Sequence, residues 1–216
     1  MNYLSFDIGT TCCKCQLFSE DGNILEYLIK EYEFKHIEEN NYIDVDAIWE
    51  HFSNMLKNIA AKHEISSVCI SSLGESFVLL DEDDNILFYP MLYNDARGEE
   101  EALDIARIVG LKNNFLITGV LPHSMYSISK LLWIKKHYPE VIIKAKKIRL
   151  MCDYIGYKLT GMRVIDYSLA SRTGVFDINN FSFSKEILEQ LDISIDLFSI
   201  PRRAGTVVGS LKKCNS

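Results

Sequence analysis

The sequence lacks an excess of basic residues and lacks any long apolar run. Lys and Arg total 23 against 30 Asp and Glu, giving a net charge of −7 and no basic surface suited to nucleic acid. No apolar run approaches the roughly 18 residues that span a bilayer. The N-terminus has no basic segment before its short apolar stretch, which argues against a signal peptide. We therefore expect a cytoplasmic protein that binds neither nucleic acid nor a membrane.

The cysteines include no C-x-x-C pair. The six are Cys12, Cys13, Cys15, Cys69, Cys152 and Cys214. The first three fall on or beside one expected strand, where neighbouring side chains point to opposite faces, so they do not converge on one metal ion. We interpret all six as small buried hydrophobic side chains with free thiols, typical of a reducing compartment.

The first third of the chain predicts an α/β unit with an antiparallel beginning. Strands are predicted over residues 3–7, 13–18 and 24–32, the last two joined by a tight turn. A helix then begins at Asp44, with apolar residues three and four positions apart, and leads to a strand over residues 66–71. With 48% hydrophobic and 25% charged residues, the chain can bury a substantial core.

The rest of the chain is predicted to be mostly helical after one hairpin. The hairpin strands at 77–80 and 86–89 flank an acidic turn that imitates a calcium loop, but Ile86 replaces the required glycine and Leu92 the required glutamate. The basic run of Lys144, Lys146, Lys147 and Arg149 is interpreted as a solvated face. Helices are predicted over residues 95–109, 127–137, 152–159 and 184–191, and a final strand over 204–211.

The tract Asp-Ile-Gly-Thr-Thr at residues 7–11 has the composition of a phosphate-binding turn. Gly9 allows close approach to the backbone, and Thr10 and Thr11 add hydroxyl donors. Asp7 could bind Mg²⁺ directly or through water, and Lys14 follows on the next strand. A plain hairpin turn is the alternative. The tract also resembles the first phosphate loop of actin, of heat-shock chaperone ATPases and of activator ATPases.

Residues 125–137, Met-Tyr-Ser-Ile-Ser-Lys-Leu-Leu-Trp-Ile-Lys-Lys-His, resemble the N-terminal signature of the FGGY carbohydrate kinase family. The signature has constrained positions that Met125, Ser127, Lys130 and Trp133 fill. An ordinary amphipathic helix with a Lys on its polar side is the alternative. The tracts at 93–97, 152–155 and 166–171 are also similar to family tracts, with Tyr93 in place of a Trp.

The resemblance implies a ribonuclease-H-like, actin-like ATPase domain, an α/β fold with a mixed five-stranded sheet flanked by helices. Residues 1–216 would form the sugar-binding N-terminal domain of a kinase similar to xylulokinase, gluconokinase or glycerol kinase. It implies ATP and Mg²⁺ as cofactors, a small sugar or polyol as substrate, a pentulose such as xylulose above others, and it allows a homodimer. We expect the C-terminal ATP-binding domain and the general-base aspartate beyond Ser216, so these residues alone would neither phosphorylate sugar nor bind ATP tightly.

The resemblance places the sugar contacts at Gly74, Glu75, Asp95, Arg97 and Tyr126. Glu75 falls where xylulokinase-like members carry His and glycerol kinases carry Glu, and a carboxylate can accept two hydroxyl hydrogen bonds from a polyol. Gly74 replaces a bulky Met or Arg, which implies a roomier pocket. Glu75 as a buried structural carboxylate is the alternative.

Some features leave other interpretations open. His123 is interpreted as an exposed loop residue in preference to a sugar contact. A different actin-like ATPase would share residues 7–11 but not the signature at 125–137. A non-catalytic sugar-binding or regulatory paralogue is compatible with the atypical tract at 73–76.

Overall fold

The computed structural model describes residues 1–211, and the chain folds as two compact units, Met1–Leu73 and Gly74–Ser216. Each unit has its own sheet and its own buried side chains. None of the helices in residues 1–211 has the length and apolar character needed to cross a membrane.

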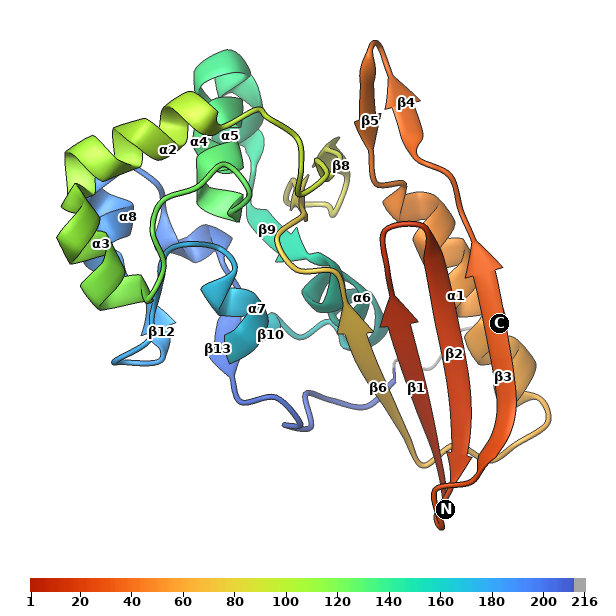
Figure 1. Cartoon of the computed structure of the whole chain (residues 1–216). Helices are drawn as coiled ribbons and strands as arrows, with labels where there is room; N and C mark the ends of the chain where they lie inside the picture. The colour runs from red at the N-terminus through yellow and green to blue at the C-terminus, as the bar shows by residue number, and fades with distance from the viewer. Residues whose placement is uncertain (212–216) are drawn as a thin grey trace. The chain divides into compact units, whose positions relative to one another are not determined.

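The first unit is built on a mixed four-stranded sheet in the order β3-β2-β1-β6, with helix α1 (Val45–Ala60) packed against β2 and β3 (Figure 1). The antiparallel strands are β1 (Asn2–Ile8), β2 (Cys12–Ser19) and β3 (Ile24–Glu31). Strand β6 (Ser67–Ser72) runs parallel to β1, as a helical crossover requires. All four strands and the helix agree with the sequence-based predictions to within one residue at most ends.

Alternation of side chains gives this sheet one buried face and one open face. Leu4, Phe6 and Ile8 are buried, whereas Asp7 between them is exposed. Phe6 packs against Phe52 of α1 in a tilted arrangement, with ring centroids 4.1 Å apart. Asp44 caps α1, because its side chain accepts hydrogen bonds from backbone N–H groups of the helix, as expected of a helix start. A short hairpin of β4 (Lys35–Ile37) and β5 (Asn40–Tyr42) follows β3 and was not predicted.

The second unit surrounds a three-stranded antiparallel sheet with helices. The sheet order is β8 (Ile86–Phe88), β7 (Phe77–Leu80) and β9 (Lys147–Leu150), and the β7–β8 hairpin was predicted. Two short pairs join β10 (Val164–Asp166) to β13 (Ile200–Arg202) and β11 (Phe176–Asp177) to β12 (Ser182–Phe183). The helical elements are α2 (Glu99–Ile105), the π-helix η1 (Ala106–Gly110), α3 (Leu111–Thr118), α4 (Ser127–His137), α5 (Pro139–Lys144), α6 (Met151–Thr160), α7 (Tyr167–Ser171), α8 (Lys185–Gln190) and the 3₁₀ turn η2 (Ile195–Leu197).

The α/β class and the mixed sheet are confirmed, but three details of the prediction were wrong. The mixed sheet has four strands in residues 1–211, not five, because β7 pairs with β8 and β9 in a separate sheet. The helix predicted from residue 95 begins only at Glu99, because Gly98 has a φ of +103° that no helix interior contains. Residues 204–211 form no strand, since β13 ends at Arg202 and no neighbouring strand pairs with the segment.

Lys144 and Lys146 of the basic run are exposed, as expected of a solvated face, but Arg149 is not, and not all cysteines are buried. Arg149 lies within β9 and is 0% exposed, because both faces of this strand are covered and its neighbours Ile148 and Leu150 are buried as well. Cys13 and Cys15 are buried free thiols, as predicted. Cys12 and Cys152 are only partly buried, and Cys69 is exposed because it faces the open side of β6. Cys214 lies outside the described residues.

Arg149 is compensated by one carboxylate. Its Nε lies 3.7 Å from Asp153 Oδ1, and both side chains are almost wholly buried. Asp153 also accepts a hydrogen bond from the Ser199 hydroxyl, whose oxygen lies 2.9 Å from both carboxylate oxygens of Asp153. Arg149 Nε and Nη2 have no hydrogen-bond partner in the described part of the chain. Asp153 is therefore the main compensation of a buried guanidinium.

We expect Asp153→Ala to lower the free energy of unfolding by about 3–5 kcal/mol, because it leaves the buried guanidinium without a counter-ion. Urea denaturation measures the change. The matched control is Glu189→Ala, which breaks the exposed Lys185–Glu189 pair and should change the same quantity by less than about 1 kcal/mol. Equal effects of the two substitutions would contradict this role of Asp153.

Candidate functional site

The turn between β1 and β2 holds the predicted phosphate-binding residues in the first unit. Gly9 donates its N–H to the carbonyl of Cys12 over 2.9 Å, which closes the turn. Tyr32 fixes it from the end of β3: its hydroxyl contacts the carbonyls of Gly9 and Cys12, and its N–H donates to Thr11. The turn is therefore held through its carbonyl groups.

The donors of Thr10 and Thr11, by contrast, are available. The N–H and hydroxyl groups of Thr10 and Thr11 have no hydrogen-bond partner among residues 1–211. A Cβ added to Gly9 would meet only the Cys12 carbonyl oxygen, at 3.4 Å, so the backbone at Gly9 is open. Unpaired donors on an open turn fit a phosphate group.

The acidic residue of the turn lies on the open face of the sheet. Asp7 Oδ2 is 3.9 Å from Lys14 Nζ, with both side chains about half exposed. This surface pair is weak, so the Asp7 carboxylate stays free to accept a ligand. The two line a depression of about 610 Å³ together with Ser5, Gln16, Ile24 and Tyr27. An accessible carboxylate on the strand that leads into a turn with unpaired donors fits Mg²⁺ held next to a phosphate.

On the opposite face, the thiols behind the turn are inert. Burial, with the nearby charge of Asp7, raises the pKa of Cys13 to about 12. Burial likewise raises the pKa of Cys15 to about 12. Both thiols stay protonated at neutral pH, and neither is a nucleophile.

In the second unit, Glu75 is paired with an arginine that sequence reasoning missed. Glu75 is 7% exposed, and its Oε1 accepts a hydrogen bond from Arg172 Nη2. The Arg172 guanidinium lies 5.1 Å from the ring centroid of Tyr126. A Cβ at Gly74 would lie 3.6 Å from the Arg172 side chain, so the space left by Gly74 is partly filled by Arg172. Gly74, Glu75 and Tyr126 are therefore brought together, around Arg172.

Asp95 and Arg97 form a second cluster. Arg97 Nε donates to both Asp95 oxygens over 2.9 and 3.0 Å, and both side chains are 15% exposed. Arg97 also lies over the Trp133 ring at 5.2 Å. Burial tends to raise the pKa of Asp95, but Arg97 and Lys130 outweigh it, so the net pKa is lowered.

Lys130 supports this second cluster through hydrogen bonds from its buried side chain. It is 1% exposed, and its Nζ donates to the carbonyl oxygens of Asp95 at 2.8 Å and Arg97 at 3.4 Å. The alternative of a Lys on the polar side of an amphipathic helix is therefore wrong. Burial lowers the pKa of Lys130 to about 8, although Asp95 opposes the shift.

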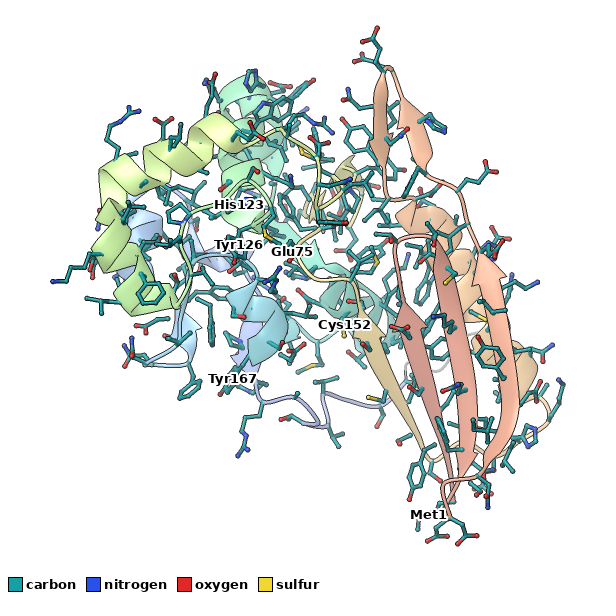
Figure 2. The ribbon with its side chains drawn as sticks, viewed as in Figure 1. Met1, Glu75, His123, Tyr126, Cys152 and Tyr167 are labelled. Carbon is teal, nitrogen blue, oxygen red and sulfur yellow. The ribbon has the colours of Figure 1, made fainter. Side chains whose placement is uncertain are left out.

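Both clusters attach to the first turns of α4 through hydrogen bonds. Figure 2 labels Glu75 and Tyr126 of the first cluster and His123 from the loop before α4. Ser127 Oγ donates to the Glu75 carbonyl over 2.7 Å, and Ser129 Oγ donates to the His123 carbonyl over 3.0 Å. The Ile128 N–H donates to the Thr173 carbonyl over 2.9 Å, which fixes the segment that carries Arg172. His123 is exposed, as interpreted from the sequence.

Arg172, which sequence reasoning missed, left only a weak signal in the sequence. Arg172 follows directly after the 166–171 tract, and a carboxylate expected to be buried needs a cation. That rule predicts a partner but does not say which of the arginines it is.

The residues at 7–14 belong to the other unit, Met1–Leu73.

The fold and these residues define the class of protein to which the chain belongs. The structure has the mixed α/β architecture of actin-like ATPases, which it shares with a ligand-bound xylulose kinase from Lactobacillus acidophilus. That match has a TM-score of 0.86 and 25% identity, and covers 98% of this chain and 44% of the other. The family model for the FGGY family of carbohydrate kinases, N-terminal domain, matches residues 2–215. The chain belongs to the FGGY family of carbohydrate kinases.

Curated relatives differ in the substrate that they are named for. A gluconokinase from Bacillus licheniformis is 31% identical, over 91% of this chain and 39% of the relative. A glycerol kinase from Thermococcus kodakarensis is 29% identical, over 97% of this chain and 44% of the relative. The chain thus spans less than half the length of the relatives that it matches.

We expect Lys130 to make stability rise with pH above pH 8. Its pKa is about 8 when folded, against about 10.4 in an unfolded chain, so the unfolded state binds more protons here between these values. The difference in free energy of unfolding between wild type and Lys130→Met should therefore increase by up to about 1 kcal/mol per pH unit from pH 8 to 10. Urea denaturation across this range measures it.

The control for this pH dependence is Lys185→Met, at an exposed lysine. Its difference from wild type should stay flat over the same range. A flat difference for Lys130→Met as well would show that Lys130 keeps an ordinary pKa in the folded chain.

Proposed function

We propose that this chain is the sugar-binding half of a kinase that transfers a phosphoryl group from ATP to a hydroxyl of a small sugar or polyol. The observation that carries the proposal is the turn at 7–11, where unpaired N–H and hydroxyl donors follow the accessible carboxylate of Asp7 along the chain. Membership of a family of carbohydrate kinases supports the same reaction.

Each residue of the turn has a distinct part in this proposal. Bound Mg²⁺ and ATP would supply the phosphoryl group and the positive charge that stabilises it during transfer. Asp7 would hold the metal, directly or through water, and Thr10 and Thr11 would donate hydrogen bonds to phosphate oxygens. Gly9 leaves room for them, and Lys14 adds positive charge to the same face.

The sugar would bind in the second unit, with Glu75 accepting a hydroxyl hydrogen bond and Asp95, Arg97 and Tyr126 nearby on the loops that α4 holds. A pentulose such as xylulose is the proposed substrate, in agreement with the xylulose kinase among the similar structures. The aspartate that accepts the hydroxyl proton is proposed to belong to a longer protein that contains this chain, as the length of the relatives suggests. A homodimer and a cytoplasmic location stay predictions.

A coupled ADP-release assay tests the reaction on that longer protein, with xylulose, ribulose, gluconate, glycerol and erythritol as acceptors. We expect xylulose to stimulate ADP release, and Asp7→Ala to lower kcat at least 100-fold because the metal loses a ligand. No stimulation by any acceptor, from a folded protein that still binds ATP, would favour the non-catalytic sugar-binding alternative.

Gly9→Ala tests the turn itself. The added methyl group meets only one protein atom, at 3.4 Å, so the free energy of unfolding should change by less than about 1 kcal/mol. The same methyl group would obstruct a phosphate, so the KM for ATP should rise at least tenfold. The matched control is Gly156→Ala on α6, where a Cβ meets nothing within 4 Å. Unchanged ATP kinetics in both variants would contradict the proposed role of the turn.

A further inference from the structure

We propose that Arg172 is a specificity-determining residue and that the Glu75–Arg172 pair selects neutral sugars against sugar acids. This inference rests on the proposed function, because it concerns the substrate class of the same site. Three features carry it: the position of Arg172, the compensation of each nearby cation, and the polar atoms that the pair leaves unused.

Arg172 is held at the site by two contacts. Its Nη2 donates to Glu75 Oε1, and its guanidinium lies over Tyr126 at 5.1 Å, while its side chain lies 3.6 Å from where a Cβ on Gly74 would be. The backbone is fixed as well, since Gly174 has a φ of +79° and its Cβ position is only 3.0 Å from Ile128. The side chain is still 36% exposed, so a ligand can reach it.

Each cation of the two clusters is already compensated. Arg97 is paired with the carboxylate of Asp95, and Lys130 is covered by two backbone carbonyl groups. Arg172 is paired with Glu75. A ligand carboxylate would therefore find no uncompensated cation in these clusters and would approach the charge of Glu75, which costs free energy at a site of low exposure.

A neutral sugar suits the polar atoms of the Glu75–Arg172 pair that have no hydrogen-bond partner. Glu75 Oε2 has no hydrogen-bond partner among residues 1–211, and neither have Arg172 Nε and Nη1. One acceptor thus lies beside two donors, with an aromatic ring against the guanidinium. Sugar hydroxyl groups both donate and accept, so adjacent hydroxyls can satisfy both members of the pair at once.

Ligand titrations followed by NMR on the 216-residue chain test the inference, because they detect dissociation constants in the millimolar range. The ligands are xylulose and ribulose as neutral ketoses and gluconate as the acid. The variants are Glu75→Gln and Arg172→Gln, which keep side-chain size and polarity, with Lys185→Gln as a control that removes an exposed charge on α8.

We expect wild type to bind a neutral ketose at least tenfold more tightly than gluconate. Glu75→Gln should reduce this preference at least tenfold, because it removes the negative charge and frees Arg172 to pair with the gluconate carboxylate. Arg172→Gln should weaken ketose binding without any gain for gluconate. Lys185→Gln should leave the preference unchanged.

The outcomes separate the inference from the proposed function. An equal effect of both variants on ketose and acid would mean that the pair is only structural, and tighter binding of gluconate by wild type would also overturn the inference. If the folded wild-type chain binds none of the ligands, the proposed sugar-binding function itself fails.

Discussion

The hydrogen bonds donated by the first turns of α4 hold the second unit's candidate site together. Ser127, Ser129 and Lys130 are at most 1% exposed, and each donates to a carbonyl of a different loop segment. A buried donor left without its acceptor costs roughly 1–3 kcal/mol, so the loops and the helix are ordered together. The family signature on this helix therefore acts by positioning the loops, while Glu75, Asp95 and Arg97 present the polar groups.

Local patterns were sufficient for much of the fold. The β1–β2–β3 strands, α1 with its Asp44 cap, and α4 could be predicted because their periodicity and turn residues are contained in short stretches of sequence. The turn at 7–11 could be predicted as a candidate phosphate site for the same reason, since its glycine and hydroxyl residues are contiguous.

Features that depend on distant partners could not be predicted. Arg172 meets Glu75 across 97 positions of sequence, and no local pattern marks that pair. Arg149 was misread because a basic run resembles a solvated face unless both faces of its strand are known to be covered. Residues 204–211 have a strand-like composition, but a strand also needs a neighbour to pair with.

The unequal burial of the cysteines gives the chain a built-in chemical reporter. Cys69 is exposed on β6, whereas Cys13 and Cys15 lie on the buried face of β2 with pKa values of about 12. An alkylating reagent at neutral pH would therefore modify Cys69 in the native state, while modification of the two inner thiols would require the sheet to open. Mass spectrometry of the labelled peptides could thus measure the rate at which this sheet opens, with no cysteine introduced into the sequence.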